Sequence, residues 1–195
     1  MSKIALTPNA SGSGTFTIAS PNSDTDRVLT LPDSSATVST IDGITMAEQW
    51  RITADLTGDF NPISTNLEVV DTYSPGTIGT GMSESSGIFT FPSTGIYLIT
   101  ANLVQQVIST ADYCRLIIHI TTDNSSYNSA SVAYASSANT GTAFNGGEAK
   151  FVFDVTDTTT HKVRFRVIQA NTGNKIKGST SESLTHFTFI RLGDT

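Results

Sequence analysis

The chain has 195 residues, which is enough for one sizeable domain with an appendage and too few for two full domains. Hydrophobic residues make up 37% of the chain and charged residues only 14%, which argues against a disordered protein, because disorder combines low hydrophobicity with high charge. The net charge of −6 provides no electrostatic footprint for a phosphate backbone, so nucleic acid is not an expected partner.

The cysteine content and the amino terminus bear on stability and compartment. A single cysteine, Cys114, excludes an intramolecular disulfide framework, so stability has to come from core burial or from association between chains. Residues 1–14 contain no apolar leader, and no apolar run approaches the roughly 18 residues of a membrane-spanning helix. We therefore expect a protein made in the cytoplasm, without a secretion signal and without a membrane partner.

Residues 1–43 are predicted to form an extended anchoring arm, because they hold too little apolar surface for a core. Two short alternating runs, 14–18 and 27–31, indicate small strands on either side of the turn-rich segment 21–26. A lone hairpin of this size is marginal in water, so the arm has to dock on a partner or stay mobile. The apolar side chains expected to anchor it are Phe16, Ile18, Val28, Leu29 and Leu31.

Residues 44–195 are predicted to form one all-β domain. At most one helical turn is expected around 41–49, and strand signals then recur at short spacing between Gly, Pro, Asn, Asp and Ser clusters. They cover 50–56, 66–71, 87–91, 95–107, 113–122, 129–135, 147–155, 162–169 and 184–192. The glycine-rich segment 141–147 is expected to be a flexible loop. Eight to ten strands without helical periodicity predict a β-sandwich or jelly roll.

Several predicted strands are apolar on both faces, notably at 97–99, 116–118 and 189–190. One face of a sandwich sheet packs on the core, so a second apolar face needs another cover. The chain has no helix layer to provide it, and an identical subunit is the economical alternative. The pattern therefore predicts self-association.

The run Gly87-Ile88-Phe89-Thr90-Phe91-Pro92-Ser93-Thr94-Gly95-Ile96-Tyr97 resembles the signature of the C1q and tumour necrosis factor superfamily, in which G-x-F-x-x-P-x-x-G-x-Y precedes an apolar strand. Each residue of this motif has a physical role: Phe89 would fill the core, Pro92 and Gly95 would make a turn, and Tyr97 would return to the core. The segment 184–192 resembles that superfamily's closing strand. The resemblance implies a jelly roll of ten strands that assembles as a homotrimer.

Carried onto this chain by strand parity, the resemblance implies candidate interface residues. Tyr97, Ile99, Ala101 and Leu103 would face the core, while Leu98, Thr100 and Asn102 would face the threefold axis, where Asn102 would need a hydrogen-bond partner. Phe187 and Phe189 share one face of the closing strand, and we include them among the interface candidates, although parity alone leaves open which face that is.

The arm, with Thr30-Leu31-Pro32, is similar to short segments that precede or link domains in bacteriophage virion proteins. The combination of arm and head resembles a virion structural protein of marine or cyanobacterial phages. It implies a trimeric knob, located in the virion, that is anchored through residues 1–43 to other virion proteins such as the major capsid protein. Capsid decoration or a head fibre is the first interpretation, a short tail fibre the alternative, and a free glycan-binding or signalling module the third.

The sequence predicts no enzyme and no cofactor. His119, His161 and His186 lack the spacing of a metal site, and Cys114 is expected to be buried within a strand rather than to act as a nucleophile. The pairs Asp24/Asp26 and Asp154/Asp157 lie near predicted turns. They are interpreted as turn carboxylates, with calcium ligation as the alternative.

One strand carries an unusual row of positive charge for an acidic protein. Lys162, Arg164 and Arg166 alternate with apolar residues and therefore share a face. We interpret the row as solvated or paired with a partner subunit or capsid surface, with ligand binding as the alternative. Tyr127 and Tyr134 leave a host surface glycan as a further possible partner.

Overall fold

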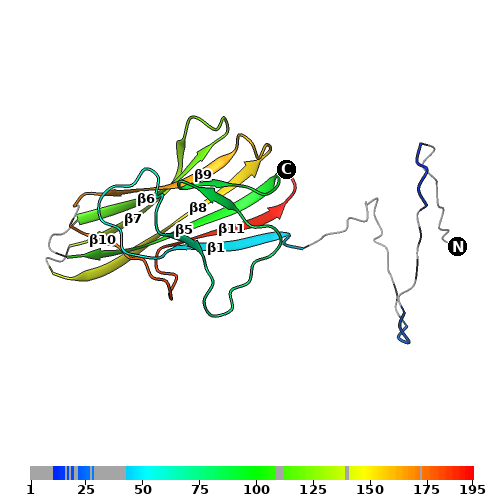
Figure 1. Ribbon diagram of the computed structural model, residues 1–195, viewed down its shortest axis with the longest axis horizontal. Coiled ribbons are helices and arrows are strands. Elements are labelled where there is room, and N and C mark those ends of the chain that lie inside the picture. The colour runs from blue at the N-terminus through cyan, green and yellow to red at the C-terminus, as the bar shows by residue number, and fades with distance from the viewer. Residues whose placement is uncertain are drawn as a thin grey trace. The chain divides into compact units, whose positions relative to one another are not determined.

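The computed structural model describes residues 11–15, 17, 19, 22–26, 28, 43–108, 112–138, 141–171 and 173–195. The chain divides into two units, Met1–Thr40 and Ile41–Thr195, and the strands belong to the second (Figure 1). In the first unit the predicted anchor residue Val28 is 90% exposed, and Phe16, Ile18, Leu29 and Leu31 lie outside the described residues.

The described part of the second unit contains strands and no helix, as the alternating sequence pattern predicts. The strands are β1 (Met46–Ile52), β2 (Leu67–Val69), β3 (Ser83–Ser85), β4 (Ile88–Thr90), β5 (Gly95–Val107), β6 (Asp112–Thr121), β7 (Asn128–Ser137), β8 (Ala143–Val155), β9 (Lys162–Gln169), β10 (Lys175–Ile176) and β11 (His186–Gly193). The short strands β3 and β10 were not predicted, because neither is long enough to show an alternation.

These strands form two antiparallel sheets that enclose the core. In sheet A, β8 pairs with one edge of β5 along its whole length, while β11 and then the short β10 pair with the other edge, and β1 and β2 follow β11. Sheet B has the order β3-β4-β9-β6-β7. Each sheet therefore has one face on the core and one face turned outward.

The run 87–97, which we call the signature turn, has the structure that its sequence predicts. Phe89 is completely buried, and the hydroxyl of Tyr97 donates a hydrogen bond of 2.9 Å to the carbonyl oxygen of Ser93, which closes the turn. Gly95 has φ +147°, and a Cβ there would lie 2.6 Å from the carbonyl oxygen of Gly193, so the position requires glycine. Beyond this turn β5 alternates strictly between buried and half-buried residues. Its core residues include Tyr97, Ile99, Ala101 and Leu103, which confirms the predicted parity.

Phe187 and Phe189 correct the predicted interface. In the β11–β5 register Phe187 lies opposite Ala101 and Phe189 opposite Ile99, and directly paired residues of antiparallel strands point to the same face. Both phenylalanines are therefore completely buried in the core, where the Phe187 ring stacks on Phe165 at a centroid distance of 3.7 Å. Neither side chain is available to a partner subunit from this position, so their assignment to the interface was wrong.

The first strand starts earlier than predicted. β1 begins at Met46, in the segment where at most a helical turn was expected, and sends Met46, Glu48 and Trp50 into the core. Glu48 is buried because its Oε2 accepts hydrogen bonds from the indole nitrogen of Trp50 at 2.7 Å and the backbone nitrogen of Met82 at 2.8 Å. A glutamate at a core position breaks the apolar alternation, which is why the pattern failed to reveal this strand.

The glycine-rich segment is also a strand rather than the expected loop, since β8 begins at Ala143 and runs through Gly146 and Gly147. A Cβ on Gly147 would lie 2.7 Å from the carbonyl oxygen of Tyr134 in β7. The glycine therefore allows the backbones of β7 and β8 to approach each other across the two sheets.

Candidate functional site

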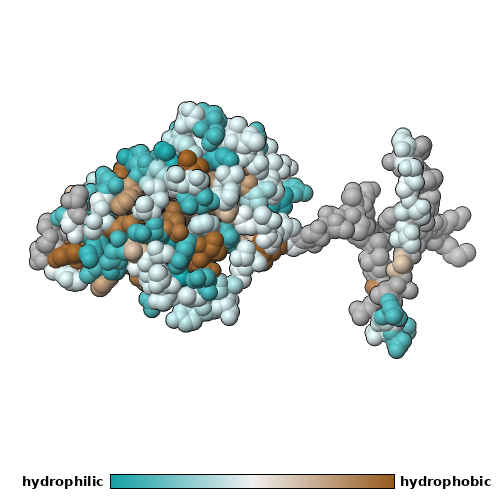
Figure 2. All heavy atoms as spheres, in the orientation of Figure 1, coloured by the Kyte–Doolittle hydropathy of each residue, from teal (hydrophilic) through white to brown (hydrophobic). Residues whose placement is uncertain are grey.

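The outer face of sheet A carries an apolar row across four adjacent strands. Ala47 in β1 lies opposite Ile190 in β11, Ile190 opposite Leu98 in β5, and Leu98 opposite Val152 in β8. We call these four residues the apolar row. Val152 is 56% exposed and the other three are half-buried, so the row is open to solvent in a single chain. Figure 2 shows apolar patches between hydrophilic ones on the face that it presents.

Polarity increases over the two rows that follow the apolar row on the same face. The next row consists of Gln49, Thr188, Thr100 and Lys150, and the row beyond it of Arg51, His186, Asn102 and Glu148. The register thus places the predicted interface residues Leu98, Thr100 and Asn102 on the outer face, in three successive rows. Whether a partner subunit covers them stays a prediction.

Asn102 has the hydrogen-bond partner that its position requires, and this partner belongs to the same chain. The Nδ2 of Asn102 lies 3.0 Å from the Nε2 of His186, whose Nδ1 lies 3.2 Å from the carbonyl oxygen of Leu184. A ring that donates from Nδ1 and accepts at Nε2 satisfies both contacts. In the same row Glu148 forms an ion pair of 2.9 Å with Lys150. The polar rows are therefore largely satisfied within the chain, and the apolar row is not.

The other candidate chemical residues do not converge on one site. Cys114 is completely buried, as predicted, and burial, followed by the charge of Asp59, raises its pKa to about 12. Asp157 accepts hydrogen bonds from the hydroxyl and backbone nitrogen of Thr159, and these bonds lower its pKa, as expected of a turn carboxylate. No group of His, Cys, Asp and Glu within the described residues has the composition of a metal site.

The outer face of sheet B brings together three arginines, and we call it the arginine face. Arg164 and Arg166 in β9 lie opposite His119 and Ile117 in β6, and Arg115 joins them from β6. The guanidinium carbon of Arg164 lies 3.9 Å from the ring centroid of Tyr127, and that of Arg115 lies 5.4 Å from the ring of Tyr134. These are cation–π contacts.

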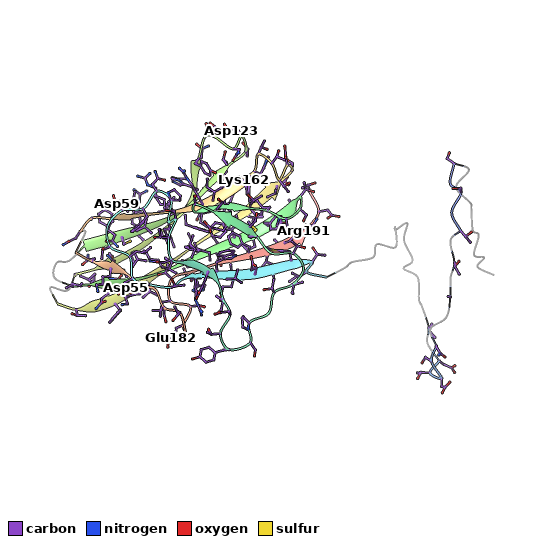
Figure 3. All side chains as sticks on the ribbon, viewed as in Figure 1. Asp55, Asp59, Asp123, Lys162, Glu182 and Arg191 are labelled. Carbon is purple, nitrogen blue, oxygen red and sulfur yellow. The ribbon has the colours of Figure 1, made fainter. Side chains whose placement is uncertain are left out.

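The arginine face differs from the predicted row of Lys162, Arg164 and Arg166. Lys162 (Figure 3) does not contribute to this face, because its Nζ donates hydrogen bonds of 3.1 Å to Thr90 Oγ1 and 2.6 Å to the Thr158 carbonyl oxygen. Arg115, which sequence reasoning missed, takes its place through the pairing of β6 with β9. Only the register between these strands could have revealed it.

The charge of the arginine face acts on the histidine within it. Burial is the main cause that lowers the pKa of His119 to about 4, and the positive charges of Arg164 and Arg166 add to it. Burial also lowers the pKa of Arg164, and Arg166 contributes to that shift. Within the part of the chain that the structure describes, no ion pair involves any of the three arginines.

Two antiparallel sheets, the signature turn and the order of the strands define an all-β protein with a jelly roll of the tumour necrosis factor type, as the sequence predicted. It is similar to the crystal structure of murine APRIL at pH 5.0, with a TM-score of 0.55 and 14% identity over 75% of this chain and 98% of that chain. It is also similar to Eiger TNF from S. frugiperda, with a TM-score of 0.56 and 11% identity over 78% of this chain and 95% of that chain.

At these identities the likeness is one of fold alone. No family model and no curated protein matches the sequence. In the described residues, no helix is long and apolar enough to cross a membrane.

Proposed function

We propose that the protein is a non-enzymatic structural component that forms a homotrimeric knob through the outer face of sheet A. The observation that carries this proposal is the apolar row of Ala47, Ile190, Leu98 and Val152, which no element of the described chain covers. Exposed apolar surface of this kind is stabilised by burial against another molecule, at about 25 cal/mol per Å².

A second copy of the chain is the best-supported cover for this face. The two polar rows that follow the apolar row are largely satisfied within the chain, so an identical subunit could exclude water from the apolar row without burying unpaired charges. The resemblance to C1q and tumour necrosis factor domains implies three copies around an axis. An obligate assembly of this kind would bury about 2,000 Å² or more.

We further propose that the knob belongs to a bacteriophage virion and is anchored there by residues 1–43. The support is the similarity of the arm to virion segments. Its length, roughly 130 Å if fully extended, also suits an anchor rather than a fibre shaft. A trimeric decoration of the capsid or a head fibre fits an arm without heptads or β-repeats better than a tail fibre does.

The mass of the full chain in solution tests the trimer. Light scattering at micromolar concentration should give three times the mass of 20.6 kDa. Val152→Asp should lower the mass to that of a monomer that remains folded, because Val152 is 56% exposed in the single chain and a carboxylate there would be desolvated only in the assembly. Leu98→Asp should act in the same way.

Tyr134→Asp is the matched control, since it places the same charge on an exposed site of the other sheet. It should leave the mass unchanged. A monomeric wild-type chain would refute the trimer, and so would a Val152→Asp variant with the wild-type mass.

Electron cryomicroscopy of virions tests the proposed setting. Knobs distributed over the capsid in many copies would support decoration or a head fibre. Knobs restricted to the tail would refute that ranking in favour of a tail fibre.

A further inference from the structure

From the arginine face of sheet B we infer a binding site for a carboxylated saccharide. Guanidinium groups bind carboxylates through paired hydrogen bonds, and tyrosine rings that are partly exposed offer an apolar surface to the C–H face of a sugar. The arginine face combines both features on one sheet surface. The proposal does not depend on the trimer, which would use the opposite sheet.

The three arginines lie close together because of the strand register. Arg164 and Arg166 are two residues apart on β9, and their cross-strand partners on β6, His119 and Ile117, are also two residues apart on one face. Arg115 continues the same face by two more residues. Adjacent positions of this kind are about 7 Å apart along a strand, so neighbouring guanidinium groups can reach one small ligand.

The arginine face lacks the acceptors that its donors require. The Nε–H donors of Arg115 and Arg164 are buried without a hydrogen-bond partner among the described residues, and so is the Nδ1 of His119, which donates or accepts according to the tautomer. Ion pairs elsewhere on the described surface hold Arg51, Lys150 and other cations, but none of the three arginines here. Donors without an acceptor are costly, and an anionic ligand would supply acceptors to the terminal guanidinium N–H groups of the three arginines, which make no hydrogen bond or ion pair with a described residue.

The tyrosines favour a saccharide over an acidic peptide. Tyr134 lies directly opposite Arg115 in the register and is 60% exposed, and Tyr113 beside it is 44% exposed, with a centroid distance of 6.3 Å between the rings. These rings offer a sugar an apolar stacking surface beside the guanidinium group of Arg115, which lies 5.4 Å from the Tyr134 ring centroid. An acidic peptide would need the arginines only, whereas a sugar acid would use the arginines and the rings together.

Isothermal titration of the full chain with a hexamer of mannuronate tests the proposal, with cellohexaose as the neutral saccharide and hexaglutamate as the acidic peptide. We expect saturable binding of the mannuronate hexamer, none of cellohexaose and weaker binding of hexaglutamate. Arg166→Gln should weaken mannuronate binding by about tenfold, since a hydrogen bond to a charged group is worth that factor or more. Arg166 is suitable because it makes no hydrogen bond or ion pair with a described residue.

Two further variants separate the site from general charge effects. Lys150→Gln removes the same charge from the opposite sheet and should leave mannuronate binding unchanged. Tyr134→Ala should weaken mannuronate binding but not hexaglutamate binding, because only the sugar would use the ring.

Three results would overturn the inference. The first is the absence of saturable mannuronate binding. The second is equal loss of affinity in Lys150→Gln and Arg166→Gln, which would indicate a non-specific charge effect. The third is hexaglutamate binding as tight as that of mannuronate and insensitive to Tyr134→Ala, which would point to an acidic protein partner. None of these results bears on the mass measurement that tests the trimer, so the two proposals fail separately.

Discussion

Replacement of Phe187 by alanine is expected to destabilise the fold without changing the subunit interface. The side chain is completely buried, stacks on Phe165 at 3.7 Å and contacts Phe89 at a centroid distance of 6.4 Å. Truncation of a core phenylalanine costs about 3–5 kcal/mol, a large part of the 5–15 kcal/mol that typically stabilises a domain. Urea denaturation followed by tryptophan fluorescence of Trp50 would measure the loss.

The adjacent residue provides the matched control. Thr188 lies on the opposite face of β11, so Thr188→Ala should cost much less, since it removes one hydrogen bond from Gln49 that is worth about 1 kcal/mol. Phe187→Leu keeps most of the buried volume and should cost less than about 1.5 kcal/mol, which provides a folded variant if the alanine protein does not fold. A folded Phe187→Leu protein with wild-type stability but a lower oligomeric mass would refute the core assignment and restore Phe187 to the interface.

Three further outcomes are expected. His119 titrates at about 4 in the fold and at 6.5 when unperturbed, so the folded state binds its proton less readily, and stability should fall by about 3 kcal/mol as the pH decreases from 6.5 to 4. His119→Gln should make the urea midpoint less dependent on pH between 6.5 and 4. A variant with the same pH dependence as the wild type would contradict the lowered pKa of His119. Cys114 should resist an aromatic disulfide reagent at pH 8 until urea unfolds the chain, and rapid modification of the native protein would show that it is not buried. Gly147→Ala should cost about 1–3 kcal/mol, because the new Cβ would lie 2.7 Å from the Tyr134 carbonyl oxygen, whereas Gly141→Ala, with open space around it, should have little effect; equal midpoints would exclude the close approach of β7 and β8.

The sequence allowed the fold class and one strand to be predicted in detail. The strict alternation of β5 between apolar and mixed positions indicated which side chains enter the core, and the glycine and tyrosine of the signature turn fixed where that strand begins. Alternation fails where a core position is polar, as at Glu48, or where a strand needs glycine for close approach, as at Gly147. In both cases the reason lies in a neighbour distant in sequence, which a local pattern cannot reveal.

The candidate surfaces were less accessible to sequence reasoning than the core, because a surface is made of rows that cross strands. Parity on the closing strand grouped Phe187 with Phe189 but gave no indication of the face, which only the pairing of Phe187 with Ala101 determines. The same dependence on register hid Arg115, and Lys162 leaves the arginine face because its Nζ donates hydrogen bonds to Thr90 and Thr158. Residues that share a strand can be grouped from sequence, while residues that share a face across strands require the structure.

The two outer faces differ in a way that separates their roles. On sheet A the polar side chains form hydrogen bonds with one another, as Asn102 does with His186. The apolar row beside them has no hydrogen bonds to water that its burial would break. On sheet B the arginines retain unpaired donors and exposed aromatic neighbours, so removal of water there is favourable only if the partner supplies acceptors. A subunit with the same outer face of sheet A can cover the first surface, because its own apolar row needs the same burial. The second surface calls for a partner that brings negative charge, and assembly through sheet A would leave it open to such a ligand.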